Sequence, residues 1–226
     1  IYVEIPDLDF FDVTCSATLV GPQAIVTARH CTPLIDIVMY YGGTAYMVFG
    51  ANAFAPDQMV PIVDFVNAPA SPNHPGLLGD GGRDVSVAHL ASAPVGITPA
   101  KLGRFDSCDL HEKFQIVGYG GHNADFFYGE KFVGTAKATA DHGRWYRLLF
   151  ENSKARFENW YFSDAPTNRT QAEADAWWNG FPLEPRYEAV LEGKSVACFG
   201  DSGGPMLQGS KASNMTTYGV SFAVEG

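Results

Sequence analysis

Short segments with the apolar pattern of β-strands recur along the chain, separated by turns rich in glycine, proline and aspartate. Residues 84–90 (Asp-Val-Ser-Val-Ala-His-Leu) alternate in polarity as a half-buried strand does. Residues 14–20 and 24–27 flank the turn sequence Gly-Pro-Gln, a pattern typical of a β-hairpin. We expect further strands at residues 38–41, 46–49, 59–66, 114–117, 132–139, 145–151, 206–207 and 218–222.

Two regions are less regular than the rest. Residues 1–13 mix acidic and aromatic residues without a clear period, and the aromatic run 157–162 is compatible with a packed loop. The sequence Thr-Gln-Ala-Glu at residues 170–173 has the spacing of a helix-capping box and predicts one short helix ending near Asn179 and Gly180. Many short strands with one isolated helix indicate an all-β protein.

The composition supports a globular protein. The chain has 226 residues, of which 46% are hydrophobic and 18% charged, so it can bury a sizeable core. Its formal net charge of -10 argues against a nucleic acid or an anionic membrane as partner, because phosphate binding needs clustered Lys and Arg. No apolar run has the length of a membrane span, since Asp36 interrupts the best candidate at residues 34–41. We therefore expect a soluble protein.

The cysteines favour disulfide bonds over a metal site. The chain contains four, which are Cys15, Cys31, Cys108 and Cys198. None belongs to a close Cys-x-x-Cys pair of the kind that zinc and redox sites use. Cys15 and Cys31 flank the predicted hairpin, whose antiparallel pairing would bring them together. The histidines other than His30 are too scattered along the sequence for a metal motif, so we expect neither a metal nor a cofactor.

Disulfides also bear on the compartment. They form in oxidising surroundings, so a disulfide framework predicts a secreted protein. The sequons at Asn168 and Asn214 are compatible with a glycosylating secretory pathway.

Residues 198–205 (Cys-Phe-Gly-Asp-Ser-Gly-Gly-Pro) are the strongest candidate for chemistry. A serine hydroxyl is a poor nucleophile unless a base takes its proton and dipoles stabilise the oxyanion formed when it attacks a carbonyl. The glycines around Ser202 let the backbone fold tightly, so that the N–H groups of Gly200 and Ser202 can point into one oxyanion hole. A surface turn would explain a shorter Gly-Asp-Ser-Gly sequence but explains eight residues less well.

The order of the candidate base and acid along the chain separates the known hydrolase classes. In α/β-hydrolases, which also use Gly-x-Ser-x-Gly, the acid and the histidine follow the serine, whereas no His or Asp follows Ser202 here. The subtilisin order places the acid before the histidine. The aspartates before His30 are Asp7, Asp9 and Asp12, and the alternating strand and helix pattern of that fold is missing. The order histidine, aspartate, serine remains.

Four short motifs occur in that order. Residues 27–31 (Thr-Ala-Arg-His-Cys) are similar to Thr-Ala-Ala-His-Cys, the histidine motif of a known protease family. Residues 84–87 (Asp-Val-Ser-Val) are similar to the aspartate motif of the same family, Asp-Ile-Ala-Leu. Residues 118–120 (Gly-Tyr-Gly) match Gly-Trp-Gly, and residues 200–205 (Gly-Asp-Ser-Gly-Gly-Pro) form the most specific motif. By these motifs the chain resembles the chymotrypsin-type (trypsin-fold) serine endopeptidases.

The resemblance implies an all-β chymotrypsin-like fold of two antiparallel β-barrels, with the catalytic groups between them. Residues 1–110 would form the first barrel and residues 111–226 the second, with a helical or irregular insertion in the second. It also implies a secreted serine endopeptidase that cleaves through an acyl-enzyme without a cofactor. Its partners would be protein or peptide substrates and protein inhibitors.

The same resemblance assigns roles to single residues. Ser202 would be the nucleophile and His30 the general base, while Asp84 would hold the imidazole in the right tautomer and stabilise its cation. The N–H groups of Gly200 and Ser202 would bind the oxyanion.

The resemblance also assigns substrate-binding residues. The family's substrate-binding strand maps to Ser221, Phe222 and Ala223. Ser221 would support Asp84 by hydrogen bonding, and the backbone of Phe222 and Ala223 would pair with the substrate as an added strand. Val196 would lie at the base of the primary pocket, where trypsin-like members carry Asp, so a bound Arg or Lys would lack a counter-charge. Ala197 and Ala223 add apolar bulk. Cleavage after small or medium apolar residues is therefore expected.

Two departures from the family pattern concern the neighbours of the serine. Family members usually become active when a new N-terminal Ile inserts its ammonium next to the aspartate before the serine. Here that pair would be Ile1 and Asp201, although the glycines after the family's Ile are missing. The family's partner for Cys198 lies beyond the point where this chain stops. By elimination Cys198 pairs with Cys108, or one of the two is free.

The alternative from another functional class is a catalytically silent protease homologue that acts as a binding or regulatory domain. Such homologues usually show a broken triad, whereas this triad is complete. The altered N-terminus and a chain that stops at Gly226, before the family's final helix, favour the alternative, because a misformed oxyanion hole would silence an intact triad.

Overall fold

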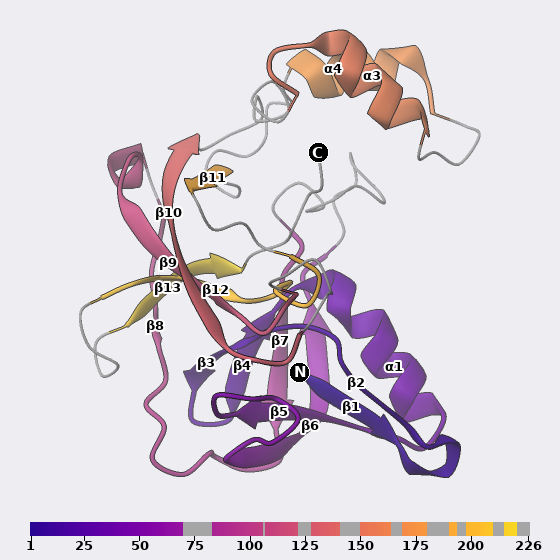
Figure 1. Cartoon of the computed structure of the whole chain (residues 1–226), viewed down its shortest axis with the longest axis vertical. Coiled ribbons are helices and arrows are strands. Elements are labelled where there is room, and N and C mark those ends of the chain that lie inside the picture. The colour runs from indigo at the N-terminus through magenta and orange to yellow at the C-terminus, as the bar shows by residue number, and fades with distance from the viewer. Residues whose placement is uncertain are drawn as a thin grey trace.

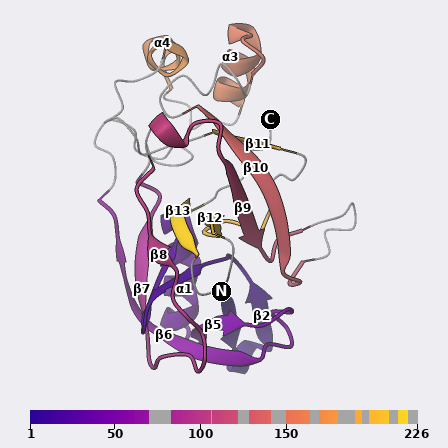
Figure 2. The same ribbon diagram turned by 90° about the vertical axis from the view of Figure 1, so that its left-hand side faces the viewer.

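The computed structural model describes residues 1–69, 83–105, 107–121, 128–140, 150–163, 169–179, 190–193, 198–209 and 215–220. Within these ranges the chain forms a seven-stranded and a six-stranded β-sheet with few helices (Figures 1 and 2). The strand orders are β2-β1-β5-β6-β7-β4-β3 and β11-β10-β9-β12-β13-β8, and neither closes on itself among the described strands. The expected all-β class with two sheets is confirmed.

The first sheet takes its strands from the N-terminal part of the chain. They are β1 (Tyr2–Ile5), β2 (Phe10–Val13), β3 (Thr18–Gly21), β4 (Ala24–Thr27), β5 (Thr44–Phe49), β6 (Gln58–Asn67) and β7 (Ser86–Leu90). All neighbours are antiparallel. β7 alternates buried and exposed side chains, as its sequence predicts. The sequence did not predict β1 and β2, because residues 1–13 mix acidic and aromatic residues without a clear period.

A helix, α1 (Thr32–Tyr40), replaces the strand expected at residues 38–41, so that prediction is wrong. Ile35 and Val38, three residues apart, are buried on one face of α1 and pack into the core of the first sheet. The helix ends in a Schellman-type cap, in which the N–H of Gly43 donates to the carbonyl of Val38 (2.9 Å). Helical burial has therefore overridden the strand propensity of the Val-Met-Tyr-Tyr run.

The second sheet contains β8 (Lys101–Leu102), β9 (Lys113–Gly118), β10 (Phe132–Ala140), β11 (Val190–Gly193), β12 (Pro205–Gln208) and β13 (Thr216–Val220). Its neighbours are antiparallel except for β8 and β13, which are parallel. Phe105, Phe114, Ala138 and Met206 form its core. The expected domain boundary near residue 110 stays a prediction, and β8 lies before it in the chain.

Two further helices, α3 (Lys154–Ser163) and α4 (Gln171–Asn179), lie at one end of the molecule (Figure 2). The capping box predicted for α4 is formed, because the Glu173 carboxylate accepts from the N–H of Thr170 (2.8 Å) and the Thr170 hydroxyl accepts from the N–H of Glu173 (3.3 Å). The helices α3 and α4 pack around a shared core, which consists of Phe150, Phe157, Tyr161, Ala174, Trp177 and Trp178. No described helix is both long and apolar enough to cross a membrane.

Residues 157–162, whose aromatic pattern is compatible with a packed loop, are part of α3 instead, so the packed-loop interpretation is wrong. Phe157 and Tyr161 lie four residues apart and bury the same face of the helix against α4. Most of the strand expected at residues 145–151 lies outside the described residues, and its described end, from Phe150, is a turn.

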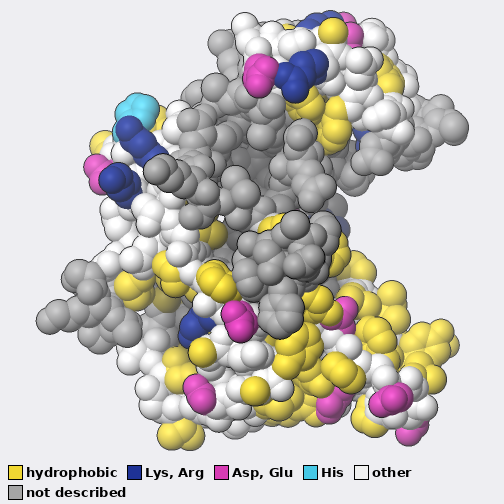
Figure 3. Space-filling model, in the orientation of Figure 1, with side chains coloured by type: hydrophobic (Ala, Val, Ile, Leu, Met, Phe, Trp, Pro, Cys, Tyr) yellow, Lys and Arg dark blue, Asp and Glu magenta, His cyan; other side chains and the backbone are white. Residues whose placement is uncertain are grey.

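Exposed aromatic side chains connect β2 of the first sheet to the segment before β10 of the second sheet. Hydrophobic groups gather over β1, β2 and α1 (Figure 3), and Phe11 of β2 is 58% exposed. The ring of Phe11 contacts Phe54, which in turn contacts Tyr128 near β10 with ring centroids 5.7 Å apart. The hydroxyl of Tyr128 donates to Asp12 (3.0 Å), so β2 is tied to the segment that leads into the second sheet.

The minor 3-10 turns complete the described secondary structure. They are η1 (Pro6–Leu8), η2 (Arg29–Cys31) and η4 (Ser107–Asp109). Backbone hydrogen bonds also join the two parts of the chain, from Ala53 to Gly129 (2.7 Å), from Lys131 to Ala51 (2.8 Å) and from Ser16 to Ser202 (2.8 Å). The last of these places the candidate nucleophile against the first sheet.

Candidate active site

The pairing of two antiparallel strands brings His30 and Asp84 together. In the register of β4 and β7, Thr27 lies opposite Ser86. His30 follows the end of β4 in the turn η2, and Asp84 precedes the start of β7, so both residues emerge at the same end of the sheet.

A disulfide closes the base of the turn that carries the histidine. Cys15 and Cys31 are bonded, with their Cα atoms 6.3 Å apart, as the hairpin predicts. The sulfur atoms and a ring nitrogen of His30 lie within 4.8 Å of one another, a cluster that would suit a metal ion if the cysteines were reduced. As a disulfide the sulfurs are no longer thiolate ligands, so this cluster does not fit a metal.

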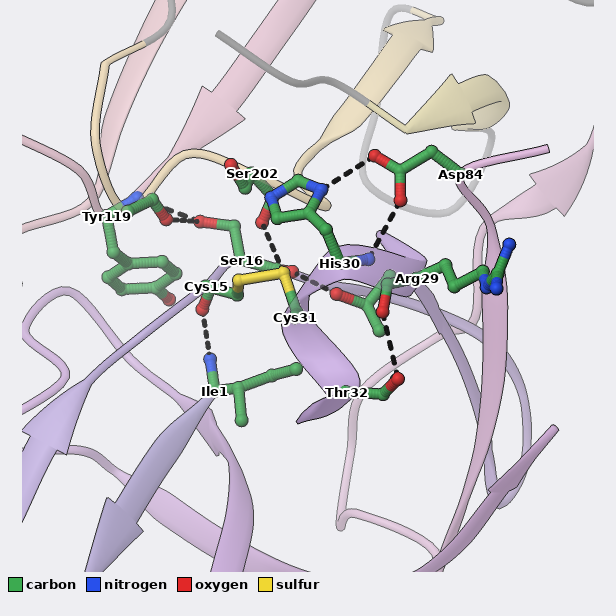
Figure 4. The surroundings of a disulfide bond; sticks show 12 residues. Ile1, Cys15, Ser16, Arg29, His30, Cys31, Thr32, Asp84, Tyr119 and Ser202 are labelled. Carbon is green, nitrogen blue, oxygen red and sulfur yellow. Dashed lines mark hydrogen bonds and ion pairs between the residues drawn. A yellow bond between two sulfur atoms is a disulfide. The ribbon is translucent and has the colours of Figure 1, made fainter. Parts of the chain in front are cut away.

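Asp84 contacts His30 with both of its carboxylate oxygens. One oxygen lies 2.6 Å from the imidazole Nδ1, and the other accepts from the backbone N–H of His30 at 2.8 Å (Figure 4). The Asp84 side chain is 9% exposed, whereas that of His30 is 48% exposed. The buried carboxylate therefore holds one edge of the ring and leaves the other edge open to the surroundings.

The pKa of Asp84 reflects this environment. Burial raises it, but the hydrogen bond and charge of the His30 ring, together with the amides of His30 and Arg29, outweigh burial and hold the pKa below its usual value. Asp84 is thus an anion at neutral pH, as required of a group that stabilises an imidazolium.

Ser202 lies beside this pair. Its carbonyl oxygen accepts from the N–H of Ser16 (2.8 Å) and is 3.9 Å from the disulfide sulfur of Cys31, the residue after His30. Figure 4 shows the His30 ring between the Asp84 carboxylate and Ser202. Among the hydrogen bonds of the described residues, none joins the Ser202 hydroxyl to His30. The structure therefore brings the three predicted residues together with the serine hydroxyl unengaged.

The backbone around Ser202 adopts conformations that require glycine. Gly200 has a φ of 96° and Gly203 a φ of 83°, both in the left-handed region. A Cβ on Gly203 would lie 2.8 Å from the backbone nitrogen of Ala28 and closer still to Thr27. In the described part of the chain, no hydrogen bond uses the N–H of Gly200 or Ser202 as donor. These amides are thus available to an incoming oxygen.

Asp201 explains the Gly-Tyr-Gly motif. Its two carboxylate oxygens accept from the N–H groups of Gly120 (2.8 Å) and Cys198 (2.9 Å). A Cβ on Gly118 would lie 2.6 Å from the carboxyl carbon of Asp201, and one on Gly120 would lie 2.7 Å from the same atom. The glycines of the motif therefore make room for this side chain.

The amino group of Ile1 does not make the ion pair with Asp201 that the resemblance implies. The amino group of Ile1 is buried and donates to the carbonyl of Cys15 instead (Figure 4). Burial lowers the pKa of this amino group to about 5, which favours the neutral amine over the ammonium that an ion pair needs.

The expected disulfide between Cys108 and Cys198 is also not formed. Cys108 lies in η4, just before β9 begins, whereas Cys198 contacts Asp201 beyond the other end of β9. A six-residue strand spans roughly 20 Å, far more than the ~7 Å that a disulfide tolerates between Cα atoms.

Several predicted residues lie outside the described part of the chain. They are the pocket residues Val196 and Ala197, the substrate-strand residues Ser221, Phe222 and Ala223, and the sequon residues Asn168 and Asn214.

Two residues near the site were not predicted from the sequence. Ser16 is 2% exposed and contacts the serine loop, and Phe199, immediately before Gly200, is 82% exposed. The position of Phe199 inside the serine motif was an available signal. For Ser16 the sequence offers none, because a small polar residue in a strand-like run is equally typical of an exposed face.

Comparisons with known proteins agree with this geometry at the level of fold. No protein-family model and no curated protein matches the sequence. Among solved structures, mouse neuropsin, a serine protease expressed in the limbic system of the brain, aligns with a TM-score of 0.51 and 16% identity, over 90% of this chain and 74% of the neuropsin chain. A likeness at this identity establishes the fold alone. The chain therefore has the trypsin-type serine protease fold.

Proposed function

We propose that this protein is a secreted serine endopeptidase in which Ser202, His30 and Asp84 form the catalytic triad. The observation that carries the proposal is the buried Asp84 carboxylate, which holds both the ring and the backbone N–H of His30 while the other edge of the ring faces Ser202. A merely structural histidine would not need an anionic partner on one edge and a half-buried serine neighbour on the other.

The reaction would proceed by acyl transfer. The Ser202 hydroxyl attacks the substrate carbonyl carbon while its proton passes to the free nitrogen of His30. The carbonyl oxygen becomes an oxyanion, for which the N–H groups of Gly200 and Ser202 are the candidate donors. Histidine then protonates the leaving amine, an acyl-serine forms, and a water molecule hydrolyses it by the same steps in reverse order.

The substrates would be proteins or peptides, and protein inhibitors would compete for the same site. The serine protease activity of the structurally similar neuropsin supports this class of substrate. The sequence-derived pocket residues Val196, Ala197 and Ala223 support cleavage after small or medium apolar residues. The Cys15–Cys31 disulfide supports an oxidising, extracellular location.

The second candidate function is that of a catalytically silent homologue that binds partners. Two observations favour it: the Ser202 hydroxyl makes no hydrogen bond to His30, and Ile1 contacts Cys15 rather than Asp201. The first carries limited weight, because catalytic hydrogen bonds are often long before substrate binds. An active enzyme is therefore the preferred assignment.

Labelling with a fluorophosphonate separates the two functions. The enzyme should be labelled stoichiometrically on Ser202 and should hydrolyse fluorescein-labelled casein, and Ser202→Ala should lose the label and about a millionfold in kcat. Ser92→Ala, at an exposed serine outside the site, is the matched control and should behave as wild type. Folded wild-type protein that takes up no label would support the silent homologue.

A further inference from the structure

A buried serine from the first sheet region contacts the nucleophile loop through several of its polar atoms. Ser16 is 2% exposed. Its hydroxyl donates to the carbonyl of Gly200 (3.0 Å) and accepts from the N–H of Tyr119 (3.1 Å), and its own N–H donates to the carbonyl of Ser202 (2.8 Å) (Figure 4). Both of these hydroxyl hydrogen bonds are therefore made with the nucleophile loop or with Tyr119 in the segment beside that loop.

Ser16 is itself held firmly. Its carbonyl oxygen accepts from the hydroxyl of Thr27 (2.8 Å), which is fully buried at the end of β4. Its neighbour Cys15 is fixed by the disulfide to Cys31. The hydroxyl of Ser16 is thus held in a fixed position, from which its hydrogen bonds orient other groups.

The bonds from Ser16 act on the backbone that carries the candidate oxyanion donors. Gly200 has no side chain to restrict its rotation, and it sits in the left-handed region with a φ of 96°. The bond on the Gly200 carbonyl fixes the peptide plane that joins Gly200 to Asp201, and the bond on the Ser202 carbonyl fixes the plane that joins Ser202 to Gly203. These planes lie on both sides of the peptide group that carries the N–H of Ser202, and the first adjoins the peptide group that carries the N–H of Gly200. Ser16 therefore restricts the rotations that set the directions of both N–H groups.

We propose that the hydroxyl of Ser16 is a positioning group for the oxyanion-binding N–H groups of Gly200 and Ser202. This inference rests on the proposed function and adds to it a residue that touches neither substrate nor the reacting atoms. It also assigns a means of shaping the oxyanion hole that does not involve the amino group of Ile1.

The test is the variant Ser16→Ala, which removes the hydroxyl and keeps the backbone N–H that bonds to Ser202. With a tetrapeptide p-nitroanilide that has Val before the cut, kcat should fall about 10- to 100-fold while KM changes little. This is less than the roughly 100- to 1,000-fold loss for deletion of an oxyanion donor itself. The Ki of a peptide boronic acid with the same sequence should rise by a similar factor, because its tetrahedral adduct occupies the oxyanion hole.

The matched control is Ser86→Ala. Ser86 is 1% exposed, and its hydroxyl donates to a backbone carbonyl, that of Val66 (3.3 Å), away from the nucleophile loop. Both alanine variants lose one buried hydroxyl, but only Ser16→Ala should change kcat and the boronate Ki. If Ser16→Ala is folded and matches Ser86→Ala in both constants, the positioning role is overturned.

Two further outcomes keep the inference separate from the proposed function. If Ser16→Ala does not fold, Thr27→Val removes only the donor that holds the Ser16 carbonyl. It should lower kcat and weaken boronate binding by a smaller factor, and unchanged constants would overturn the proposal. If wild-type protein neither hydrolyses the anilide nor takes up fluorophosphonate, it is the proposed function that fails, and the role of Ser16 fails with it.

Discussion

The two parts of the candidate site are held in place by different kinds of interaction. His30 and Asp84 flank the paired strands β4 and β7 of one sheet, and the disulfide of Cys31 lies next to the histidine. Ser202 lies in a loop before β12 that is held by hydrogen bonds from distant segments. The Ser16 bond to that loop joins residues 184 positions apart. Local pairing and a covalent bond thus position His30, and long-range hydrogen bonds position the loop of Ser202.

This difference has a practical meaning for substitutions. A change on the histidine side should affect protonation or overall stability, because the strands there also form the core of the first sheet. A change in the serine loop should affect close packing against Thr27, Ser16 and Gly120, where there is no space for added atoms.

After Ser202→Ala, the largest expected effect is that of Asp84→Asn. The amide cannot hold the imidazole in the tautomer that accepts a proton, so kcat should fall by about 10,000-fold with the fold intact. The matched control is Asp64→Asn, since Asp64 forms an exposed ion pair with His89 in the neighbouring strands. A kcat for Asp84→Asn close to that of the control would contradict the triad.

A comparison of wild type with Asp84→Asn also tests the pKa of Asp84. Because folding lowers this pKa, the carboxylate stabilises the protein above the unfolded pKa of about 3.9, and the stabilisation is lost as the pH falls through the folded value. The difference in unfolding free energy between wild type and Asp84→Asn should therefore shrink from pH 6 to pH 3, as measured by urea unfolding. A difference that does not depend on pH would contradict the shift.

Gly203→Ala should have the next largest effect. The new Cβ would strike Thr27 and the backbone of Ala28 at a positive φ, which should lower the unfolding free energy by about 3 to 5 kcal/mol. Gly96→Ala is the control, because Gly96 also has a positive φ, of 70°, but no atom lies within 4 Å of the added Cβ. It should cost about 1 to 2 kcal/mol. Equal losses in urea unfolding would mean that the loop does not pack closely against the first sheet.

Removal of the disulfide should have a smaller effect on stability. The double variant Cys15→Ala and Cys31→Ala opens a loop with a sequence separation of 16, which should lower the unfolding free energy by about 3 kcal/mol. Dithiothreitol should lower the stability of wild type to the same level and leave the double variant unchanged. A response of the double variant to dithiothreitol would reveal a second disulfide and contradict the separation of Cys108 from Cys198.

The smallest effect is expected far from the site. Thr170→Ala removes the capping hydroxyl of α4 and should destabilise that helix by about 1 kcal/mol, seen as faster hydrogen exchange of its first amides. The kcat should stay within about twofold of wild type, because α3 and α4 have a core of their own. A larger change in kcat would show that the helical pair supports the site.

The sequence predicted those features that depend on local pattern. The alternation in β7 and the hairpin of β3 and β4 both appear in the structure, and their pairing explains why His30 meets Asp84. The capping box likewise marked α4. In each case the signal lies within a few neighbouring residues.

The errors occurred where contacts distant in sequence decide the outcome. The strand expected in place of α1 had the right local propensity, but burial of Ile35 and Val38 requires a helix. The pairing of Cys108 with Cys198 was deduced by elimination and ignored the length of β9 between them. No local pattern marks Ser16, since its role depends on a loop from the other end of the chain.

The separate core of α3 and α4 has a spectroscopic consequence. The chain has four tryptophans, all between residues 145 and 178, and three of them, Trp160, Trp177 and Trp178, lie in these two helices. Intrinsic tryptophan fluorescence will therefore follow mainly the melting of the helical pair, while far-UV circular dichroism reports on all of the secondary structure, including both sheets. If the two signals give different midpoints, the protein does not unfold in a single two-state transition.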